Sequence, residues 1–592
     1  MNNKLTQLRI AMASAGVDAY IIPNTDSHQS EYFSQYYRSL TWLSGFTGSN
    51  ATLVITQDFG GLWTDGRYFL QGKQELAGSG IELQEMKDQT KPEYIEWAAL
   101  NLPKDAKVGI DGRLFSISQY QTMQRLFAAK NIGVVADLDL IDGLWAARPA
   151  VKAKEIFEHD VKYAGKSRVD KIALVRKDMA KLGTENYLVT ALDDIGWFFN
   201  IRGSDVSYNP VTYAFAVVNT HTVHLFIQSS KVPAAIKARL KADGIELHEY
   251  DAIQTHLASL ENTSILLAAG QTNYTLFAAL PKSCTIKMDS SIVQHLKGRK
   301  NSTEQGWLRK VMVKDGIAVS RFIKWVEDNI GKNKITELSA SNRLHEFRAE
   351  QDLFVGDSFP AISSYRGNGA IIHYKVSEAS DTELHPNGIY LIDSGGQYID
   401  GTTDITRTMT LGDTTEEEKR CYTLVLKGHI GVAALKFPEG TRGNQIDVMA
   451  RQPLWQYGLD FAHGTGHGVG FFMNVHEGPH RIGPGSGGAY NLPIIADMYS
   501  SNEPGFYKEG AFGMRIENLM ITHKAEETNF GKFLDFETIT LAPLENKLVD
   551  VNLLTKTERK WYNDYQAEVL EKLGSQMNDE ERAWLAEKCA KI

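Results

Sequence analysis

Carboxylate, imidazole and glycine residues gather in three stretches of the C-terminal half of the chain, residues 390–405, 461–480 and 500–518. Each stretch has the composition of strands joined by tight turns rather than of a helix. Carboxylates and neutral imidazoles are the groups that bind divalent metal ions and transfer protons. The three stretches therefore deserve to be interpreted together, as parts of one site.

The first stretch holds two aspartates in a predicted hairpin. An apolar strand ends at Asp393, the chain turns near Asp400-Gly401, and it returns through Asp404. If the hairpin folds about its sequence midpoint, Asp393 and Asp404 lie opposite each other, with Cβ atoms about 4.5–5.5 Å apart. Two carboxylates that close repel each other unless a proton or a cation lies between them. An Asx-turn beside a surface carboxylate would also explain this segment taken alone.

The third stretch repeats the arrangement with glutamates. Glu503 and Glu517 are placed symmetrically about Gly510, so a second hairpin would again bring two carboxylates together. Each glutamate alone could be a solvated surface residue. Two such hairpins in one domain favour a shared site.

Between the hairpins lies the glycine-rich segment His463-Gly-Thr-Gly-His-Gly-Val-Gly470, which is unsuited to a helix and suits close approach of backbone to a ligand. It lacks the GK[ST] ending of a phosphate-binding loop and the GxGxxG spacing of a dinucleotide-binding fold. A neutral imidazole from this segment and four carboxylates make five protein ligands, enough for two divalent ions that share bridging oxygens.

Two further histidine positions stand out. Residues 476–480 spell HExxH, but Gly478 and Pro479 argue against the helix that this zinc motif requires. His476 could instead donate a hydrogen bond or a proton from a loop, and His373 is expected at the end of an apolar strand. A structural role is the alternative for both.

The elements that must position these residues fall into three regions. Residues 1–145 alternate a helix near 4–15 with strands at 19–22, 51–55 and 61–63, and residues 155–300 repeat a similar order, as a divergent second copy would. From about 305 the pattern changes to long helices, at 305–331, 337–350, 415–436 and 444–457, that alternate with strands. Residues 555–592 predict an amphipathic helix packed on the body. Linkers are expected at 145–154 and near 297–304, where Ser302 or Thr303 could instead cap the next helix.

Composition excludes several classes of protein. The chain has 592 residues, a net charge of -9 and three cysteines without a CxxC pair. These values favour several globular domains in a cytoplasmic protein and argue against a nucleic-acid partner and a disulfide framework. The N-terminal segment resembles an amphipathic helix more than a signal peptide, and no apolar run is long enough to span a membrane.

With these positions in order, the chain resembles the pita-bread metallopeptidase family, in its three-domain Xaa-Pro aminopeptidase (aminopeptidase P) branch. The resemblance extends to Ile22–Tyr32, Trp63–Tyr68 and the C-terminal helical extension. It implies an α/β (α+β) chain with two related creatinase-type domains, at 1–148 and 149–304, and a pita-bread catalytic domain at 305–592.

The resemblance also implies roles for individual residues. Asp393, Asp404, His467, Glu503 and Glu517 would bind two divalent ions, with Asp404 and Glu517 bridging both ions. His373, His463 and His476 would surround the substrate, Glu503 would act as general base, and Arg515 would support the site beside Glu517. The ions are expected to be manganese, because the ligand set is rich in oxygen, with zinc or cobalt as alternatives.

The implied reaction releases the N-terminal residue from peptides with proline in the second position, through a hydroxide that bridges the two ions. A prolidase that cleaves Xaa-Pro dipeptides is the nearest alternative, and a non-catalytic pita-bread module that binds partner proteins is another. A methionine aminopeptidase would not need the N-terminal domains, and a creatinase-like enzyme would lack the ligands. The family further suggests a homodimer.

Overall fold

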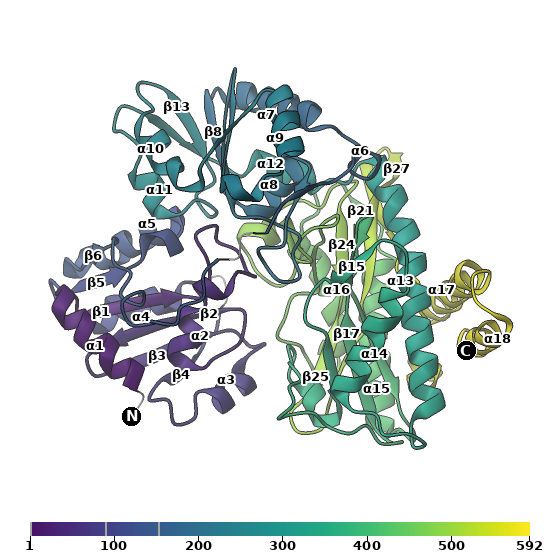
Figure 1. Ribbon diagram of the computed structural model, residues 1–592. Coiled ribbons are helices and arrows are strands. Elements are labelled where there is room, and N and C mark those ends of the chain that lie inside the picture. Colours follow the sequence, from purple (N-terminus) through teal and green to yellow (C-terminus); the bar gives the residue numbers. More distant parts are fainter. Residues whose placement is uncertain (1–2, 89–90, 152–153) are drawn as a thin grey trace. The chain divides into compact units, whose positions relative to one another are not determined.

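Two six-stranded sheets with the same topology form the N-terminal half of the protein (Figure 1). The first has the strand order β4-β3-β2-β1-β5-β6 and the second has the order β12-β11-β10-β8-β13-β14. In each sheet the central strand pairs antiparallel with one neighbour and parallel with the other. The predicted second copy of the first fold is therefore confirmed.

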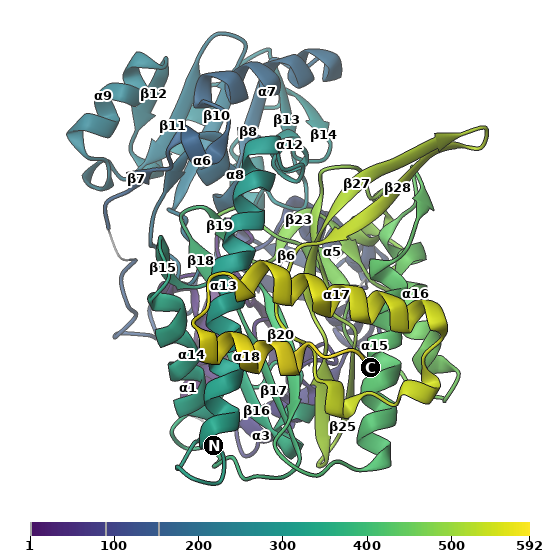
Figure 2. The ribbon, with the colours of Figure 1, turned by 90° about the vertical axis from the view of Figure 1, so that its right-hand side faces the viewer.

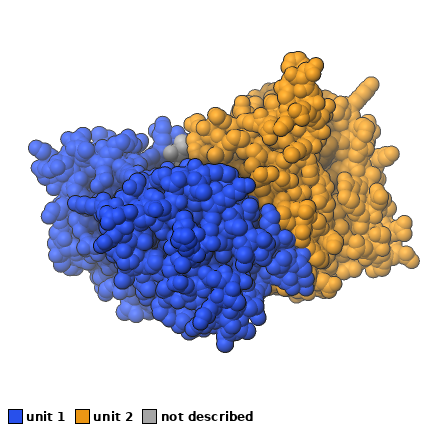
Figure 3. Space-filling model, turned by 90° about the horizontal axis from the view of Figure 1, so that it is seen from above, with its two compact units in different colours: residues 1–297 blue, residues 298–592 orange. Residues whose placement is uncertain are grey.

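This computed structural model describes residues 3–88, 91–151 and 154–592, which divide into units at residues 1–297 and 298–592 (Figure 3). The strands of the first sheet are β1 (Ala19–Pro23), β2 (Ala51–Thr56), β3 (Gly60–Thr64), β4 (Glu82–Glu85), β5 (Lys107–Ile110) and β6 (Gly133–Val135). Those of the second are β8 (Asn186–Val189), β10 (Ala214–Asn219), β11 (Val223–Ile227), β12 (Ile245–His248), β13 (Ser264–Leu267) and β14 (Thr285–Met288). Helices α1 (Asn3–Ala15), α4 (Glu93–Asn101), α5 (Ile117–Phe127), α7 (Arg168–Leu182), α9 (Ala234–Ala242) and α10 (Ile253–Ala258) belong to the same unit.

The helix boundaries follow local chemistry. Helix α7 starts at a capping box in which Ser167 and Asp170 satisfy each other's backbone N–H groups, and it ends at Gly183, whose φ is +61°. In the second unit α13 (Ser302–Asn329) has the same kind of start, but Asn301 is the cap, with Glu304 as its partner. The prediction that Ser302 or Thr303 caps this helix is therefore wrong, because both residues already lie within the helix.

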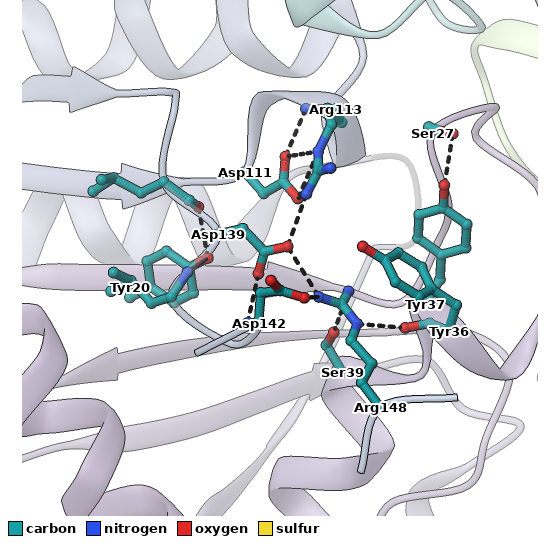
Figure 4. A network of polar contacts seen from close by, with 12 residues as sticks. Tyr20, Ser27, Tyr36, Tyr37, Ser39, Asp111, Arg113, Asp139, Asp142 and Arg148 are labelled. Atoms are coloured by element: carbon teal, nitrogen blue, oxygen red, sulfur yellow. Dashed lines mark hydrogen bonds and ion pairs between the residues drawn. The ribbon is translucent and has the colours of Figure 1, made fainter. Parts of the chain in front are cut away.

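A network of charged residues holds the segment that follows β6, the last strand of the first sheet, against the first domain (Figure 4). Arg113 and Arg148 both donate to Asp139, at 2.8 and 3.0 Å, and Arg148 also donates to the backbone oxygen of Tyr36. Arg148 belongs to the predicted linker, of which residues 152–153 lie outside the described residues. The beginning of that segment is thus anchored to the first domain.

The second unit surrounds its sheets with long helices (Figures 1 and 2). Its helices are α13, α14 (Glu337–Ala349), α15 (Glu416–Ala433), α16 (Gly443–Trp455), α17 (Lys556–Gly574) and α18 (Asp579–Lys588). The four predicted long helices are confirmed, and the predicted C-terminal helix is two helices, because Asn578 caps a new start. Tyr565, Val569 and Leu573 of α17 are buried in the core of this unit, as expected.

The strands of this unit form two three-stranded sheets, β15-β18-β19 and β16-β17-β20, a six-stranded sheet, β21-β28-β27-β24-β22-β23, and the pair β25-β26. Their bounds are β15 (Phe354–Asp357), β16 (Ile362–Tyr365), β17 (Ile389–Ser394), β18 (Gly396–Tyr398), β19 (Gly401–Thr402), β20 (Ile405–Thr410), β21 (Phe437–Pro438), β22 (Gly466–Gly468), β23 (Glu477–Ile482), β24 (Tyr499–Asn502), β25 (Gly505–Lys508), β26 (Phe512–Arg515), β27 (Asn518–Thr528) and β28 (Gly531–Thr538). Figure 2 shows β27 and β28 extending from the body as a ribbon. No helix in the described part of the chain is long and apolar enough to cross a membrane.

Candidate metal centre

The first hairpin brings its two aspartates together with a shifted register. Asp393 of β17 pairs with Thr406 of β20, so the direct opposition expected for Asp393 and Asp404 is wrong by two residues. The chain turns between Tyr398 and Gly401, later than the midpoint of the two aspartates. Because side chains alternate along a strand, a shift of two residues preserves the face. Asp404 therefore remains on the side of Asp393 as a diagonal neighbour.

The second hairpin has the expected symmetry about Gly510. Asn502 pairs with Asn518 at the end of β24 and β27, and Gly505 pairs with Arg515 at the start of β25 and β26. The register is the same in both ladders, which places Glu503 and Glu517 opposite each other in the gap between them. The predicted hairpin is confirmed.

His467 of β22 completes the cluster. Its Nε2 atom lies 3.5 Å from Oδ2 of Asp404 and 3.4 Å from Oε1 of Glu503, and Nδ1 lies 2.9 Å from the carbonyl oxygen of Gly468. If Nδ1 donates to that carbonyl, the lone pair of Nε2 points at the carboxylates, the orientation of a histidine that binds metal. Asp404, His467 and Glu517 each offer a ligand atom within 4.8 Å of the others.

Two buried oxygens test whether these residues suit a cation. Asp393 accepts a hydrogen bond from Arg515 through Oδ2, and Glu517 accepts one from Thr406 through Oε2. The second oxygen of each carboxylate, Oδ1 of Asp393 and Oε1 of Glu517, is buried without a hydrogen-bond partner. Since an unsatisfied buried acceptor is costly, a cation suits both atoms.

The electrostatics of the cluster lead to the same conclusion. Burial, and then the charge of Asp393, raises the pKa of Asp404 well above its usual range. Burial followed by the charges of Asp404 and Glu503 does the same to the pKa of Glu517, and burial also raises the pKa of Glu503. Carboxylates this crowded retain protons unless positive charge replaces them. The residues therefore fit divalent ions.

Arg515 holds the cluster from one side. Its guanidinium donates to Oδ2 of Asp393 at 2.5 Å, to the hydroxyl of Tyr507 at 2.5 Å and to Oγ1 of Thr406 at 3.2 Å. The direct ion pair is thus with Asp393, whereas the resemblance placed Arg515 beside Glu517. Arg515 also lowers the pKa of Glu517 through its charge, although burial outweighs that effect.

Tyr507 is a residue that the sequence did not single out. Because arginine only donates, the Tyr507 oxygen accepts from Arg515, and its own proton can go to Nε2 of His463, 2.8 Å away. Nδ1 of His463 lies 2.7 Å from the carbonyl oxygen of Gly464. His463 therefore connects to the centre through Tyr507 and Arg515. The sequence offers only one signal for Tyr507, its alternation with Phe506 in a short strand. An aromatic residue of the hydrophobic core would give the same pattern.

The remaining predicted histidines differ in their positions. The ring of His476 lies against that of His467, with centroids 4.3 Å apart, and is half-buried. His373 is not at the end of a strand: it lies in the turn after the 3-10 helix η6 (Arg366–Ala370), because β16 already ends at Tyr365. Residues 477–480 lie in β23, which confirms that the HExxH sequence forms no helix. His480 is buried against Ser500, and burial lowers its pKa to about 3.

The glycines of the central segment have a local explanation. A Cβ atom on Gly466 would lie 2.1 Å from the backbone oxygen of Ser501, and one on Gly468 would lie 2.3 Å from that of Glu477. Both glycines therefore permit close approach of neighbouring strands, where the sequence suggested close approach to a ligand. This packing aligns β22, and with it His467, beside β24.

Comparison with known proteins assigns the chain to a family. Residues 4–142 and 147–304 each match the creatinase/prolidase N-terminal domain, residues 306–524 match metallopeptidase family M24, and residues 532–592 match the C-terminal region of peptidase M24. The chain belongs to metallopeptidase family M24 and is an enzyme of that family.

Two relatives that match the chain over its full length are aminopeptidases by name. Aminopeptidase P1 of Lotus japonicus is 39% identical, and the match covers 99% of both chains. The crystal structure of X-prolyl aminopeptidase from Caenorhabditis elegans, described as a cytosolic enzyme with a di-nuclear active site, superposes with a TM-score of 0.94 at 33% identity and covers 100% of this chain and 99% of that one. An Xaa-Pro dipeptidase from Bacillus anthracis shares the fold over 64% of this chain and 99% of its own, with 21% identity and a TM-score of 0.50.

Proposed function

We propose that this enzyme removes the N-terminal residue from peptides with proline in the second position. The observation that carries the proposal is the buried cluster of Asp404, His467 and Glu517, whose ligand atoms lie within 4.8 Å of one another, in a chain related over its whole length to a protein named aminopeptidase P1. The dipeptidase alternative has weaker support, because that likeness is confined to the fold and to 64% of the chain.

Asp393, Asp404, His467, Glu503 and Glu517 would hold two divalent ions. When bound, such ions would lower the pKa of a coordinated water, so that hydroxide would be available near neutral pH, and would stabilise negative charge on the scissile carbonyl oxygen. The donor set of four carboxylates and one imidazole favours manganese, and zinc or cobalt could replace it.

Glu503 is the proposed general base. Its Oε1 faces His467 at 3.4 Å and accepts a hydrogen bond from Ser501, and burial raises the pKa of its carboxyl group above the usual value. It would take the proton of the attacking water. Placing that base by hydrogen bonds keeps it oriented before the substrate arrives.

His476 is the proposed donor to the leaving nitrogen. The bond before proline is a tertiary amide, so its nitrogen must gain a proton to leave as a secondary amine. The Nε2 atom of His463 already faces Tyr507, whereas the ring of His476 lies directly against His467. His463, Tyr507 and Arg515 would then act as positioning residues, and His373 would contact the substrate from the turn after η6.

The test is hydrolysis of Arg-Pro-Pro and Gly-Pro by the manganese-loaded enzyme, with Asp404→Ala as a control. Release of arginine from the tripeptide, with little attack on the dipeptide and none by the variant, is the expected result. Preference for Gly-Pro would make the enzyme a prolidase. Inactivity on both peptides with metal bound would favour the protein-binding module.

We also propose a cytosolic homodimer. The cytosolic description of the Caenorhabditis elegans enzyme and the family resemblance support this. Light scattering should give twice the chain mass of 66.1 kDa, and a mass equal to one chain would contradict it.

A further inference from the structure

Three histidines and a glutamate gather on one face of the second N-terminal sheet. Edge strand β12 runs parallel to β11, with His224 beside Glu246 and Phe226 beside His248. Because side chains alternate along strands, Glu246 and His248 point to the same face as His224. Helix α10 packs on Phe226 through the core of this domain and brings His256 within 4.7 Å of the His224 ring, measured between centroids.

The donor atoms of three of these residues form a compact triangle. Nδ1 of His224 lies 3.0 Å from Nε2 of His248 and 3.3 Å from Oε2 of Glu246, and the last two atoms are 3.9 Å apart. Ligands about 2.0–2.1 Å from a tetrahedral zinc ion lie about 3.3–3.4 Å from one another. The three separations bracket this value, so one ion could contact all three atoms after small side-chain adjustments.

The second nitrogen of His224 is also held. Nε2 lies 2.9 Å from Oγ1 of Thr222, which itself accepts a hydrogen bond from the side chain of Asn219 at 2.7 Å. A proton on Nε2 would leave the lone pair of Nδ1 directed at His248 and Glu246. Support of this kind, from the nitrogen that does not bind the ion, is the usual arrangement for a histidine ligand.

We propose that His224, Glu246 and His248 form a second metal site, which binds one zinc-like transition-metal ion, with His256 or water in the fourth position. Two imidazoles and one carboxylate favour zinc, nickel or copper over manganese. The Glu246 side chain is 56% exposed and that of His224 13%, which gives an ion a path from solvent to a well-held ligand. An ion here would tie edge strand β12 to β11.

Zinc analysis of the full-length enzyme tests the site. Wild type, His248→Gln and His224→Gln are dialysed against the same buffered zinc solution, and the metal bound per chain is measured. The matched control is His221→Gln, which alters an exposed histidine three residues before His224. Both site variants should hold one zinc ion fewer per chain than wild type, and the control should hold the same number as wild type.

Hydrogen exchange provides a local readout that is independent of the catalytic centre. Zinc should slow amide exchange in peptides that cover β11, β12 and α10 of the wild type by at least several-fold, and should not do so in His248→Gln. Equal zinc content in wild type and His248→Gln, or unchanged exchange in these peptides, would overturn the proposal. Exchange in the chelated proteins shows whether each variant is folded.

Discussion

At the scale of single residues, two carboxylates of the candidate centre present one oxygen to a protein donor and leave the other available for a cation. Asp393 and Glu517 show this division, with Arg515 and Thr406 as the donors. The residue types and their spacing could be predicted from the sequence, whereas this division of the oxygens is visible only in the structure. It also makes the contribution of each oxygen testable.

Glu517→Gln removes a negative charge from the cluster with little change of size. We expect bound manganese to fall and kcat to drop by more than about 100-fold, because the change affects a ligand and not only its support. The control is Glu509→Gln, an exposed glutamate at the tip of the same hairpin, which should behave as wild type. Metal analysis and peptide hydrolysis measure both effects, and a fully active Glu517→Gln enzyme would exclude Glu517 as a ligand.

Tyr507→Phe removes the hydroxyl that links Arg515 to His463. Loss of a group that supports a metal centre typically costs about 10–100-fold in activity, so kcat should fall roughly tenfold or more. Manganese content should not change, because Tyr507 is not a proposed ligand. Tyr457→Phe, at an exposed position, is the control. Loss of metal together with activity would show instead that Tyr507 maintains the ligands.

At the scale of elements, hydrophobic periodicity was sufficient to predict the strands near 19–22, 51–55 and 61–63 and the four long helices of the second unit. The long helices of the second unit and the repeated order of the N-terminal domains are present as expected. Tertiary constraints that the sequence does not express explain the errors. The turn between Tyr398 and Gly401 sets the register of Asp393, and the early end of β16 puts His373 in a turn.

The hairpin β25-β26 depends on a close approach between two glycines. A Cβ atom on Gly513 would lie 1.7 Å from the carbonyl oxygen of Gly369 in η6, so Gly513→Ala must displace the hairpin or η6. Overpacking of this kind costs about 1–3 kcal/mol, and we expect a lower Tm and reduced activity. Gly306→Ala, in open space on α13, should retain both. Thermal unfolding and hydrolysis assays compare the two, and equal stability would mean that the backbone yields easily.

At the scale of the whole molecule, metal binding should be linked to stability and to pH. The raised pKa values of Asp404, Glu503 and Glu517 mean that the metal-free folded protein binds more protons than the unfolded chain. Its stability should therefore fall as pH rises above about 4, the usual carboxyl value, toward the raised values. Manganese replaces those protons and should weaken this dependence.

Calorimetry of chelated and manganese-loaded enzyme between about pH 5 and 7 measures this linkage. The Tm of the chelated enzyme should decrease with pH more steeply than that of the loaded enzyme, and Glu517→Gln should reduce the slope. Parallel pH profiles for the two forms would contradict the linkage. Glu509→Gln serves again as the control for a change of net charge.

The shared strand order of the two N-terminal sheets has an evolutionary consequence. A segment that encodes one domain twice is the product of internal gene duplication, and duplicated segments diverge under separate selection. The two N-terminal domains need not have kept the same function. The histidines of β11 and β12 belong to the second copy, and the corresponding strands of the first copy, β3 and β4, contain no histidine, so the proposed metal site would distinguish the second copy from the first.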